Sequence, residues 1–226
     1  MLQIVTNIVF ENQDLVIANK PSNIPSAPLK SSTGPSFLKE VATLYPEIMS
    51  VKGFNEWEGG LLHRLDTPTS GLVLFARNQR AFDALYAQQK KDLIIKQYRA
   101  NYTRTTIHLE GFPIYPFSSP AEEPVLIHSS FRSYGKKGSA VRPIVTGSKD
   151  LPVYCTDIVP EKEGSVICTI RRGFRHQIRC HMAWAGYPLV GDTLYGGEVS
   201  ENFGLSAIGI SFINPSDGKT LSITLS

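Results

Sequence analysis

Short apolar runs separated by polar turns dominate the chain, and this pattern is typical of β-hairpins. Three pairs of runs are each joined by a turn that contains polar residues or glycine. They are residues 7–11 with 14–18, 153–159 with 165–171, and 207–213 with 220–225. Further strands are predicted at 71–76 and 93–103, and Leu61-Leu62 is expected to end another strand.

Helical spacing is clearest in residues 79–91, where Phe82, Leu85 and Tyr86 recur at i, i+3 and i+4 on one helical face. Two more helices are expected at 37–45, stopped before Pro46, and at 174–185, with Gly186 as the C-cap. Because strands outnumber helices, we predict an α+β fold with a mostly antiparallel sheet.

The length of 226 residues suits one sizeable domain or two small ones. Prolines crowd into residues 21–36 and 113–124, which predicts loops there. The second loop is the best linker candidate, but one break does not divide a chain into two domains. We therefore predict a single domain over residues 1–226.

Several classes of protein are excluded by composition. The longest apolar run, Gly71 to Ala76, is far shorter than the roughly 20 residues of a membrane-spanning helix. No basic stretch precedes the first apolar run, so no secretory signal is expected. The three cysteines are odd in number and widely spaced, which favours a reducing cytoplasm over a disulfide framework.

Positive charge is concentrated in two segments, although the net charge is only +3. Residues 124–149 and 164–191 contain no acidic residue, and the first includes Arg132, Lys136, Lys137, Arg142 and Lys149. Such segments form either a basic surface that faces phosphates or two solvated loops.

The sequence His63-Arg64-Leu65-Asp66-Thr67-Pro68-Thr69-Ser70-Gly71 places an aspartate in a loop between two apolar runs. Strand ends hold a loop rigidly, which suits a catalytic carboxylate. The alternative is a capped structural turn with a local pair between Arg64 and Asp66.

A second polar constellation spans residues 172–181. If these residues are helical, Arg175 and Arg179 lie four apart on one face with Arg172 a turn earlier, a row that binds phosphates or pairs with a buried aspartate. His176, Cys180 and His181 could be metal ligands, but the histidines are five apart. Without CxxC or HExxH, we expect hydrogen-bonding histidines and no metal. Tyr98 in KQYRA and Lys20 at a hairpin end are weak signals by themselves.

These pieces, in this order, resemble the RluA-like family of RNA pseudouridine synthases. The chain carries HRLDTPTSG, KQYRA and HQIRCHMAWAGYPLVGDTLYG, and NKPSNIP is similar to the family's first motif. The resemblance covers about residues 8–197. It implies the pseudouridine synthase-like fold, a mostly antiparallel mixed sheet whose flanking helices and loops form a central active-site cleft.

The resemblance also implies an activity: isomerisation of specific uridines in ribosomal or transfer RNA to pseudouridine, without a cofactor or metal. The family's catalytic aspartate corresponds to Asp66, which either traps the ribose C1′ or removes the 2′ proton. Tyr98 would stack on the uracil or act as a base, and Arg179 would be the partner of Asp66. Other expected RNA-binding or supporting residues are Arg64, which fills the space of the flipped base, Ile178, which packs on the base, and His63, Lys20, His176 and Gln177.

Two departures from the family pattern are visible. Phe174-Arg175 replaces the usual arginine–threonine pair, which predicts rearranged RNA contacts. Asn23 stands where the family prefers glycine, and asparagine tolerates the left-handed conformation, so the turn should survive.

No S4-type RNA-binding domain is expected before the catalytic motifs, so residues 111–149 or the catalytic domain itself would select the substrate. A monomer in the cytoplasm is expected. The alternatives are a catalytically silent RNA-binding protein and a glycoside hydrolase, for which Asp192 is the only other acid within the motifs.

Overall fold

The computed structural model describes residues 7–28, 34–145 and 151–225. The chain forms two compact units, one made of residues 1–96 and 207–226 and the other of residues 97–206. Both combine β-strands with helices, which confirms the predicted α+β class. Among these residues, no helix has the length and apolar character needed to cross a membrane.

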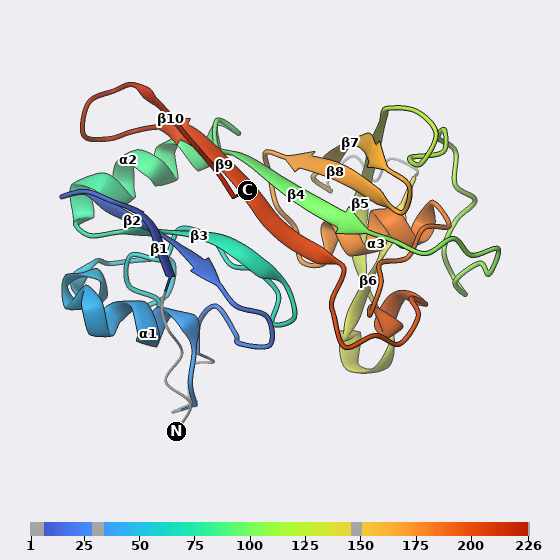
Figure 1. Ribbon diagram of the computed structural model, residues 1–226, viewed down its shortest axis with the longest axis horizontal. Helices are drawn as coiled ribbons and strands as arrows, with labels where there is room; N and C mark the ends of the chain where they lie inside the picture. The colour runs from blue at the N-terminus through green and yellow to red at the C-terminus, as the bar shows by residue number, and fades with distance from the viewer. Residues whose placement is uncertain (1–6, 29–33, 146–150, 226) are drawn as a thin grey trace. The chain divides into compact units, whose positions relative to one another are not determined.

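The strands of the first unit follow the order β1-β2-β3-β9, and β10 pairs with β9 (Figure 1). They are β1 (Asn7–Glu11), β2 (Leu15–Lys20), β3 (Ser70–Ala76), β9 (Leu205–Ile213) and β10 (Thr220–Thr224). The pairs β1–β2, β2–β3 and β9–β10 are all antiparallel. The predicted N-terminal and C-terminal hairpins are therefore confirmed.

Two helices cover opposite faces of strands β2 and β3. On one face, Leu74 of β3 belongs to an apolar cluster with Phe82 of α2 (Gln79–Lys90). On the other face, the ring of Phe75 lies 6.0 Å from that of Phe37 in α1 (Phe37–Leu44). With both faces covered, β2 and β3 read as continuous apolar runs. The helix α1 ends before Pro46, as predicted, and the 3-10 helix η1 (Pro46–Ser50) follows.

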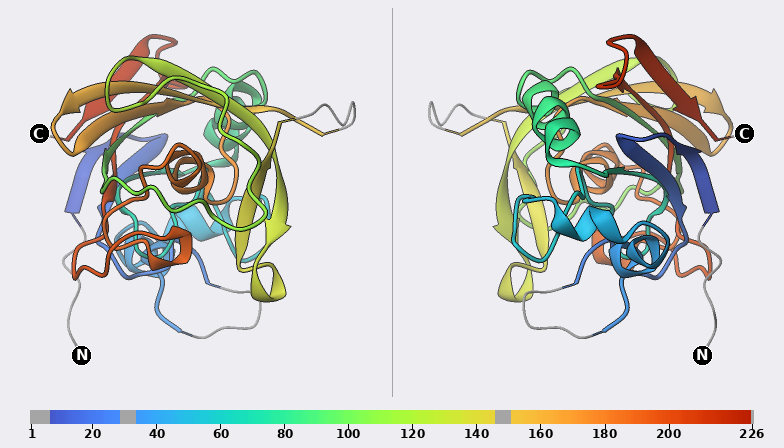
Figure 2. Two further views of the ribbon diagram at one scale, coloured as in Figure 1. Left: turned by 90° about the vertical axis from the view of Figure 1, so that its right-hand side faces the viewer. Right: turned by 90° about the vertical axis from the view of Figure 1, so that its left-hand side faces the viewer.

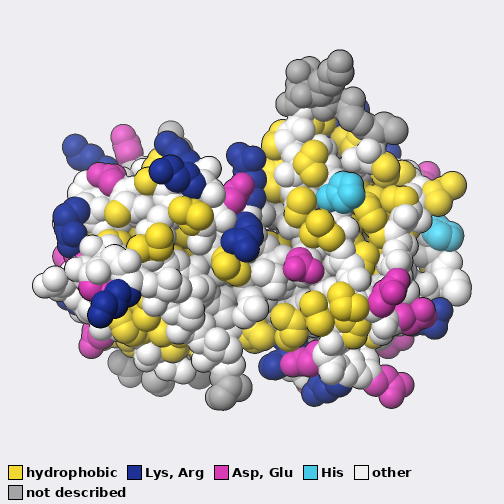
Figure 3. Space-filling view, turned by 90° about the horizontal axis from the view of Figure 1, so that it is seen from above, with side chains coloured by type: hydrophobic (Ala, Val, Ile, Leu, Met, Phe, Trp, Pro, Cys, Tyr) yellow, Lys and Arg dark blue, Asp and Glu magenta, His cyan; other side chains and the backbone are white. Residues whose placement is uncertain are grey.

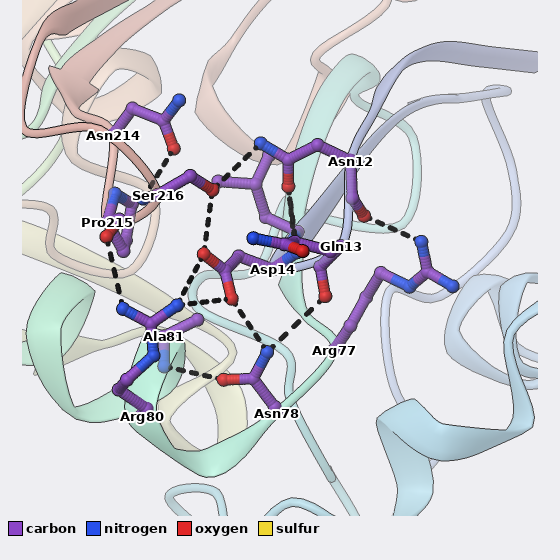
Figure 4. A network of polar contacts seen from close by, with 11 residues as sticks. Asn12, Gln13, Asp14, Arg77, Asn78, Arg80, Ala81, Asn214, Pro215 and Ser216 are labelled. Atoms are coloured by element: carbon purple, nitrogen blue, oxygen red, sulfur yellow. Dashed lines mark hydrogen bonds and ion pairs between the residues drawn. The ribbon is translucent and has the colours of Figure 1, made fainter.

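A buried carboxylate joins three separate turns of the first unit (Figure 4). Asp14, which is 2% exposed, accepts hydrogen bonds at both carboxylate oxygens from Arg80 Nη2, each at 2.7 Å. It also accepts from Asn78 Nδ2 at 2.9 Å and from Ser216 Oγ at 2.7 Å. The turn after β1, the start of α2 and the β9–β10 turn are thereby linked. Asn78 also caps α2 by accepting from Ala81 N–H.

The strands of the second unit follow the order β4-β8-β7-β5-β6. They are β4 (Ile95–Asn101), β5 (Val125–Tyr134), β6 (Ala140–Ile144), β7 (Tyr154–Lys162) and β8 (Ser165–Ile170). The predicted hairpin around 161–164 is confirmed as β7–β8. The short 3-10 helices are η2 (Lys136–Gly138) and η3 (Thr193–Tyr195).

The helix α3 (Gln177–Trp184) is buried along its whole length and contacts β6 and β7 (Figure 2). His181 is fixed from both ring nitrogens, by Ser129 Oγ at 2.9 Å and Thr156 Oγ1 at 2.8 Å. Residues 113–124, predicted to form a loop, contain no helix or strand, and this segment packs on α3. There Trp184 Nε1 donates to the carbonyl of Pro113 at 2.7 Å.

Four predicted features of the fold need correction. Leu61 forms only an isolated bridge with Phe75, so no strand ends at Leu61-Leu62. The strand predicted at 93–103 covers only Ile95–Asn101. The helix predicted from 174 starts at Gln177, because His176 has left-handed backbone angles. Residues 125–144 were missed as strands and form the antiparallel hairpin β5–β6.

The outer side of the second unit's sheet carries exposed apolar side chains. Leu126 is 52% exposed on β5 and Val159 is 46% exposed on β7. Figure 3 shows hydrophobic side chains grouped with a histidine on the face of this unit that is turned to the viewer. None of the three cysteines forms a disulfide; Cys155 is exposed, and Cys168 and Cys180 are buried.

Candidate active site

The loop that carries Asp66 is held tightly within the first unit. Ser26 Oγ donates to the carbonyl of Leu65 at 2.8 Å and accepts from Leu65 N–H at 2.9 Å. Thr69 N–H donates to the carbonyl of Asp66 at 3.0 Å, which closes the turn. These bonds fix the backbone on both sides of a half-buried carboxylate.

Glycine is required where this loop enters β3. Gly71 has φ +115, and a Cβ there would lie 2.2 Å from the carbonyl oxygen of Ala207. The contact is with backbone, so a side chain could be accommodated only by moving the strand. The final glycine of HRLDTPTSG thus allows β3 and β9 to approach closely.

Lys20 supports the Asp66 loop through hydrogen bonds to backbone carbonyls. Its side chain is fully buried, and its Nζ donates to the carbonyls of Pro21, Ile24 and Thr67 at 3.0, 2.7 and 3.1 Å. Burial lowers the Lys20 pKa to about 8, and the carboxylate of Asp66 opposes this shift. Lys20 was expected either to support the loop or to touch phosphates, and its three carbonyl partners favour loop support.

The NKPSNIP segment is fastened to the same loop. Ser22 Oγ donates to the carbonyl of Pro68 at 2.9 Å. Asn23 adopts φ 64, which confirms that asparagine takes the left-handed position where the family prefers glycine. Two motifs that are far apart in sequence therefore form one structural corner.

Arg64 and His63 precede Asp66 and point to different environments. The Arg64 side chain is 60% exposed, and its Nη1 lies 3.4 Å from Oε1 of buried Glu58. Nε2 of His63 accepts from Leu74 N–H at 3.3 Å, which places the ring proton on Nδ1. Burial, with a smaller effect from Lys96, lowers the His63 pKa to about 3, so this imidazole is neutral at pH 7.

Tyr98 lies on the buried face of β4, within the second unit. The burial of β4 alternates, so that Lys96, Tyr98 and Ala100 share the buried face. Tyr98 is 6% exposed.

Arg179 is held by a buried aspartate. Its Nε and Nη2 donate to the two carboxylate oxygens of Asp192 at 2.7 and 2.8 Å, and both residues are buried. The guanidinium carbon also lies 5.3 Å from the ring centre of Tyr195 and 5.4 Å from that of Phe203. The HQIR and GDTLYG motifs are thus joined through one bidentate ion pair.

The row of three arginines considered for a helical segment does not form, because α3 starts only at Gln177, whereas the alternative of an arginine paired with a buried aspartate is found at Arg179. Arg175 precedes α3, and its Nη2 donates to the carbonyls of Gly138 and Ala140 at 2.6 and 2.9 Å. Arg172 lies over the ring of Tyr154. The left-handed turn at His176 separates these side chains from Arg179.

The Phe174-Arg175 departure has a structural use in this chain. Phe174 stacks on Phe131 of β5, with ring centres 5.0 Å apart and an interplanar angle of 6°. Since Arg175 binds the carbonyls of the β5–β6 turn, both substituted residues anchor this hairpin.

Three further predicted site residues begin the helix α3. His176 Nδ1 lies 3.2 Å from the Tyr195 hydroxyl. Gln177 is buried, accepts from Phe174 N–H at 3.0 Å and donates to the carbonyl of Cys155 at 2.8 Å. Ile178 is 4% exposed. Gln177 therefore positions the start of the helix.

His181 was considered as a possible metal ligand, but its ring takes part in hydrogen bonds instead. Both of its ring nitrogens are occupied by hydroxyl groups, and burial lowers its pKa to about 3. Cys180 Sγ donates to the carbonyl of Val141 at 3.5 Å. Within the described ranges, no group of three or more His, Cys, Asp or Glu side chains is arranged to hold a metal ion.

The basic segment 124–149 is a hairpin rather than a loop over its described part. Lys136 and Lys137 are exposed at its turn, and Arg132 on β5 pairs in register with Arg142 on β6. Lys149 lies outside the described residues. The alternation of Ile127, Ser129 and Phe131 toward the core was the signal for β5.

Sequence reasoning also missed Lys96 and Glu58. Lys96 was quoted within KQYRA without a role, although its distance of two residues from Tyr98 places both on one strand face. No local signal indicated Glu58 as the partner of Arg64.

Comparison with known proteins gives a consistent result. The sequence profile described as RNA pseudouridylate synthase matches residues 14–184. The chain is 29% identical over 192 residues to "Ribosomal large subunit pseudouridine synthase D" of Haemophilus ducreyi, covering 85% of this chain and 53% of that protein. Its counterpart in Escherichia coli K12 is 27% identical over 219 residues, covering 97% of this chain and 61% of that protein. The chain therefore spans between half and two thirds of the length of these relatives.

Solved structures agree on the fold. Human RNA Pseudouridylate Synthase Domain Containing 1 superposes with a TM-score of 0.69 at 22% identity, covering 100% of this chain and 85% of that one. Human RNA Pseudouridylate Synthase Domain Containing 4 has a TM-score of 0.67 at 17% identity, covering 97% and 88%. The predicted pseudouridine synthase-like fold is confirmed, and the family profile matches most of the chain. The chain belongs to the RluA-like family of RNA pseudouridine synthases.

Proposed function

We propose that this chain is an RNA pseudouridine synthase that isomerises specific uridines. The observation that carries the proposal is the complete HRLDTPTSG loop, which presents a half-buried Asp66 on a backbone fixed by Lys20 and Ser26. A rigid loop matters because a catalytic carboxylate must be held within about half an ångström of its working position.

The reaction breaks the N1–C1′ bond of a uridine, turns the uracil and joins its C5 to C1′. Asp66 acts at the ribose, either by trapping C1′ or by removing the 2′ proton, and both roles need an ionised carboxylate. The C5 proton leaves, N1 gains a proton, and the product is an isomer of the substrate. The reaction thus needs no cofactor.

The target nucleotide must leave the helical stack before C1′ can react, at a cost of a few kcal/mol. Arg64 is the candidate for filling the vacated space, because its exposed guanidinium is planar and stacks on bases. Tyr98 would stack on the uracil or accept the C5 proton, with Ile178 against the base. Arg179 would act as the partner of Asp66.

The residues expected to support the active site differ in how they are placed. Lys20 and Gln177 are buried and hydrogen-bonded, which favours positioning roles. His63 and His176 are assigned to the same supporting group. One catalytic domain over residues 1–226, a monomeric state and a cytoplasmic location stay predictions.

Ribosomal large-subunit RNA is the first substrate to test, because the similar proteins are named for it. Transfer RNA is the second. The choice between ribosomal and transfer RNA would be made by the catalytic domain itself or by residues 111–149, a range that includes the basic β5–β6 hairpin.

The test uses the purified full chain on unmodified ribosomal and transfer RNA, with carbodiimide-based stops to map pseudouridine. We expect one or a few defined sites with the wild type and none with Asp66→Asn, whose fold is checked by circular dichroism. Activity in Asp66→Asn would refute the role of Asp66. RNA binding without turnover by the wild type would instead support a silent RNA-binding protein. Mapping in cells with and without the gene identifies the natural target.

A further inference from the structure

Lys96 is a buried cation to which the mechanism above gives no role. It lies on β4 and is 6% exposed. Within residues 7–28, 34–145 and 151–225 Lys96 makes no hydrogen bond or ion pair, but its Nζ is not among the fully buried side-chain atoms that lack a partner, so the ammonium keeps some contact with solvent. A largely buried ammonium without a carboxylate partner disfavours the folded state, and an apolar side chain of similar size would be better tolerated.

A buried donor without a partner in the described part of the chain is found at His63. His63 Nδ1, which carries the ring proton, is buried and has no hydrogen-bond partner among the described residues. Burial lowers the pKa of His63, and the positive charge of Lys96 adds to this effect. Two donors without an acceptor form an environment suited to a carbonyl oxygen or to negative charge.

Both donors are tied in sequence to the proposed catalytic residues. Lys96 precedes Tyr98 by two positions and shares the buried face of β4 with it. His63 precedes Asp66 by three positions, at the start of the fixed loop. A uracil that stacks on Tyr98 would bring its carbonyl oxygens to the strand face that carries Lys96.

The ammonium is charged at the pH at which it would act. Burial lowers the Lys96 pKa to about 8, while the carboxylate of Asp92 opposes the shift. Since pH 7 lies below this value, the protonated form predominates.

The reaction develops negative charge where such donors are useful. When the N1–C1′ bond breaks with its electron pair on the ring, the uracil becomes an anion whose charge spreads over N1 and the two carbonyl oxygens. Resting on the proposed function, we propose that Lys96, supported by His63 Nδ1–H, is a catalytic residue that donates a hydrogen bond to a uracil carbonyl oxygen and stabilises this charge. No proton is transferred in this contact, and the charge disappears when C5 joins C1′ and N1 is protonated.

The test compares Lys96→Met with Arg99→Met under single-turnover conditions, with saturating enzyme on the RNA that the wild type modifies. Arg99 is a matched control, because it lies on the opposite face of β4 and pairs with Glu161 at 2.8 Å. We expect Lys96→Met to lower the rate constant by about 100-fold or more, as loss of one oxyanion donor does. Arg99→Met should stay within a few-fold of wild type.

Two further measurements distinguish a catalytic role of Lys96 from a structural role. RNA affinity should be unchanged in Lys96→Met, and its unfolding temperature should equal or exceed that of the wild type, because an unpaired buried charge is gone. A lower unfolding temperature with a proportionate loss of rate would mean a structural role. Weaker RNA binding with an unchanged rate constant would mean a binding role, and either result overturns the proposal.

Lys96→Gln, also neutral but polar, serves if the methionine variant does not fold, with the same expected loss of rate. An inactive wild type would refute the proposed function. An active wild type with a fully active Lys96 variant would refute only this inference.

Discussion

The buried carboxylate of Asp14 offers a measurable test of how the first unit is held together. The change Asp14→Asn keeps the size of the side chain but removes its charge. The four acceptor contacts to Arg80, Asn78 and Ser216 then face an amide with one oxygen and one NH2 group. At least one donor of the network must therefore face another donor.

The magnitude follows from the surroundings of each partner. Hydrogen bonds to a charged group contribute about 1.5–3 kcal/mol each, and breaking a fully buried ion pair costs about 3–5 kcal/mol. The Arg80 side chain is 64% exposed, so water re-solvates it and its share is small. We expect a loss of about 2 kcal/mol, or about 4–8 °C in unfolding temperature for a chain of this length.

The loss of stability in Asp14→Asn should also depend on pH, in a direction set by the pKa of Asp14. Burial raises the Asp14 pKa, but the hydrogen bonds from Ser216, Asn78 and Arg80 together outweigh it, so the Asp14 pKa is lowered. A carboxylate whose folded pKa is depressed stabilises the protein above its unfolded pKa, near 4, and loses this effect as pH falls through the folded pKa. The difference between wild type and Asp14→Asn should be constant from about pH 5 to 8 and shrink below about pH 4.

Thermal unfolding followed by circular dichroism at several pH values measures both quantities. Asp83→Asn is the control, because this exposed aspartate on α2 has a single hydrogen bond within the described part of the chain, from Gln79. It should change stability by no more than about 0.5 kcal/mol. An unfolding temperature of Asp14→Asn within 1 °C of wild type at pH 7, roughly the control level, would refute the reasoning.

Two further predictions concern the RNA. Tyr98→Phe should bind RNA like the wild type but slow the single-turnover rate severely, whereas a near-normal rate would remove the hydroxyl as a base and leave only stacking. Lys136→Ala combined with Lys137→Ala should weaken RNA binding and lower the slope of log affinity against log salt by about 1–2, because each phosphate contact contributes about 0.7–0.9. An unchanged slope in salt titrations would mean that this hairpin turn does not contact RNA.

The sequence by itself determined the elements that depend on neighbouring residues. The hairpin β1–β2, the helix α2 and the hairpin β9–β10 were predicted, because their apolar spacing and turn residues are local signals. Asp66 was placed correctly in a loop before β3 for the same reason. The left-handed Asn23 was also predicted, since it depends only on the intrinsic tolerance of asparagine.

Only the tertiary structure decided the features that depend on distant partners. The start of α3 moved to Gln177, because His176 adopts left-handed angles beside Tyr195. Arg179 bonds to Asp192, thirteen residues away, rather than standing in a row of free cations. These outcomes follow from which groups meet when strands pair, and no local period records that.

The burial of a charged side chain also depends on distant partners. Lys20 and Lys96 read as ordinary surface lysines in the sequence, yet both are buried. For Lys20 three carbonyls replace water, and for Lys96 no described group does. The free energy of a charge depends on the atoms packed around it, so its role becomes visible only after the chain has folded.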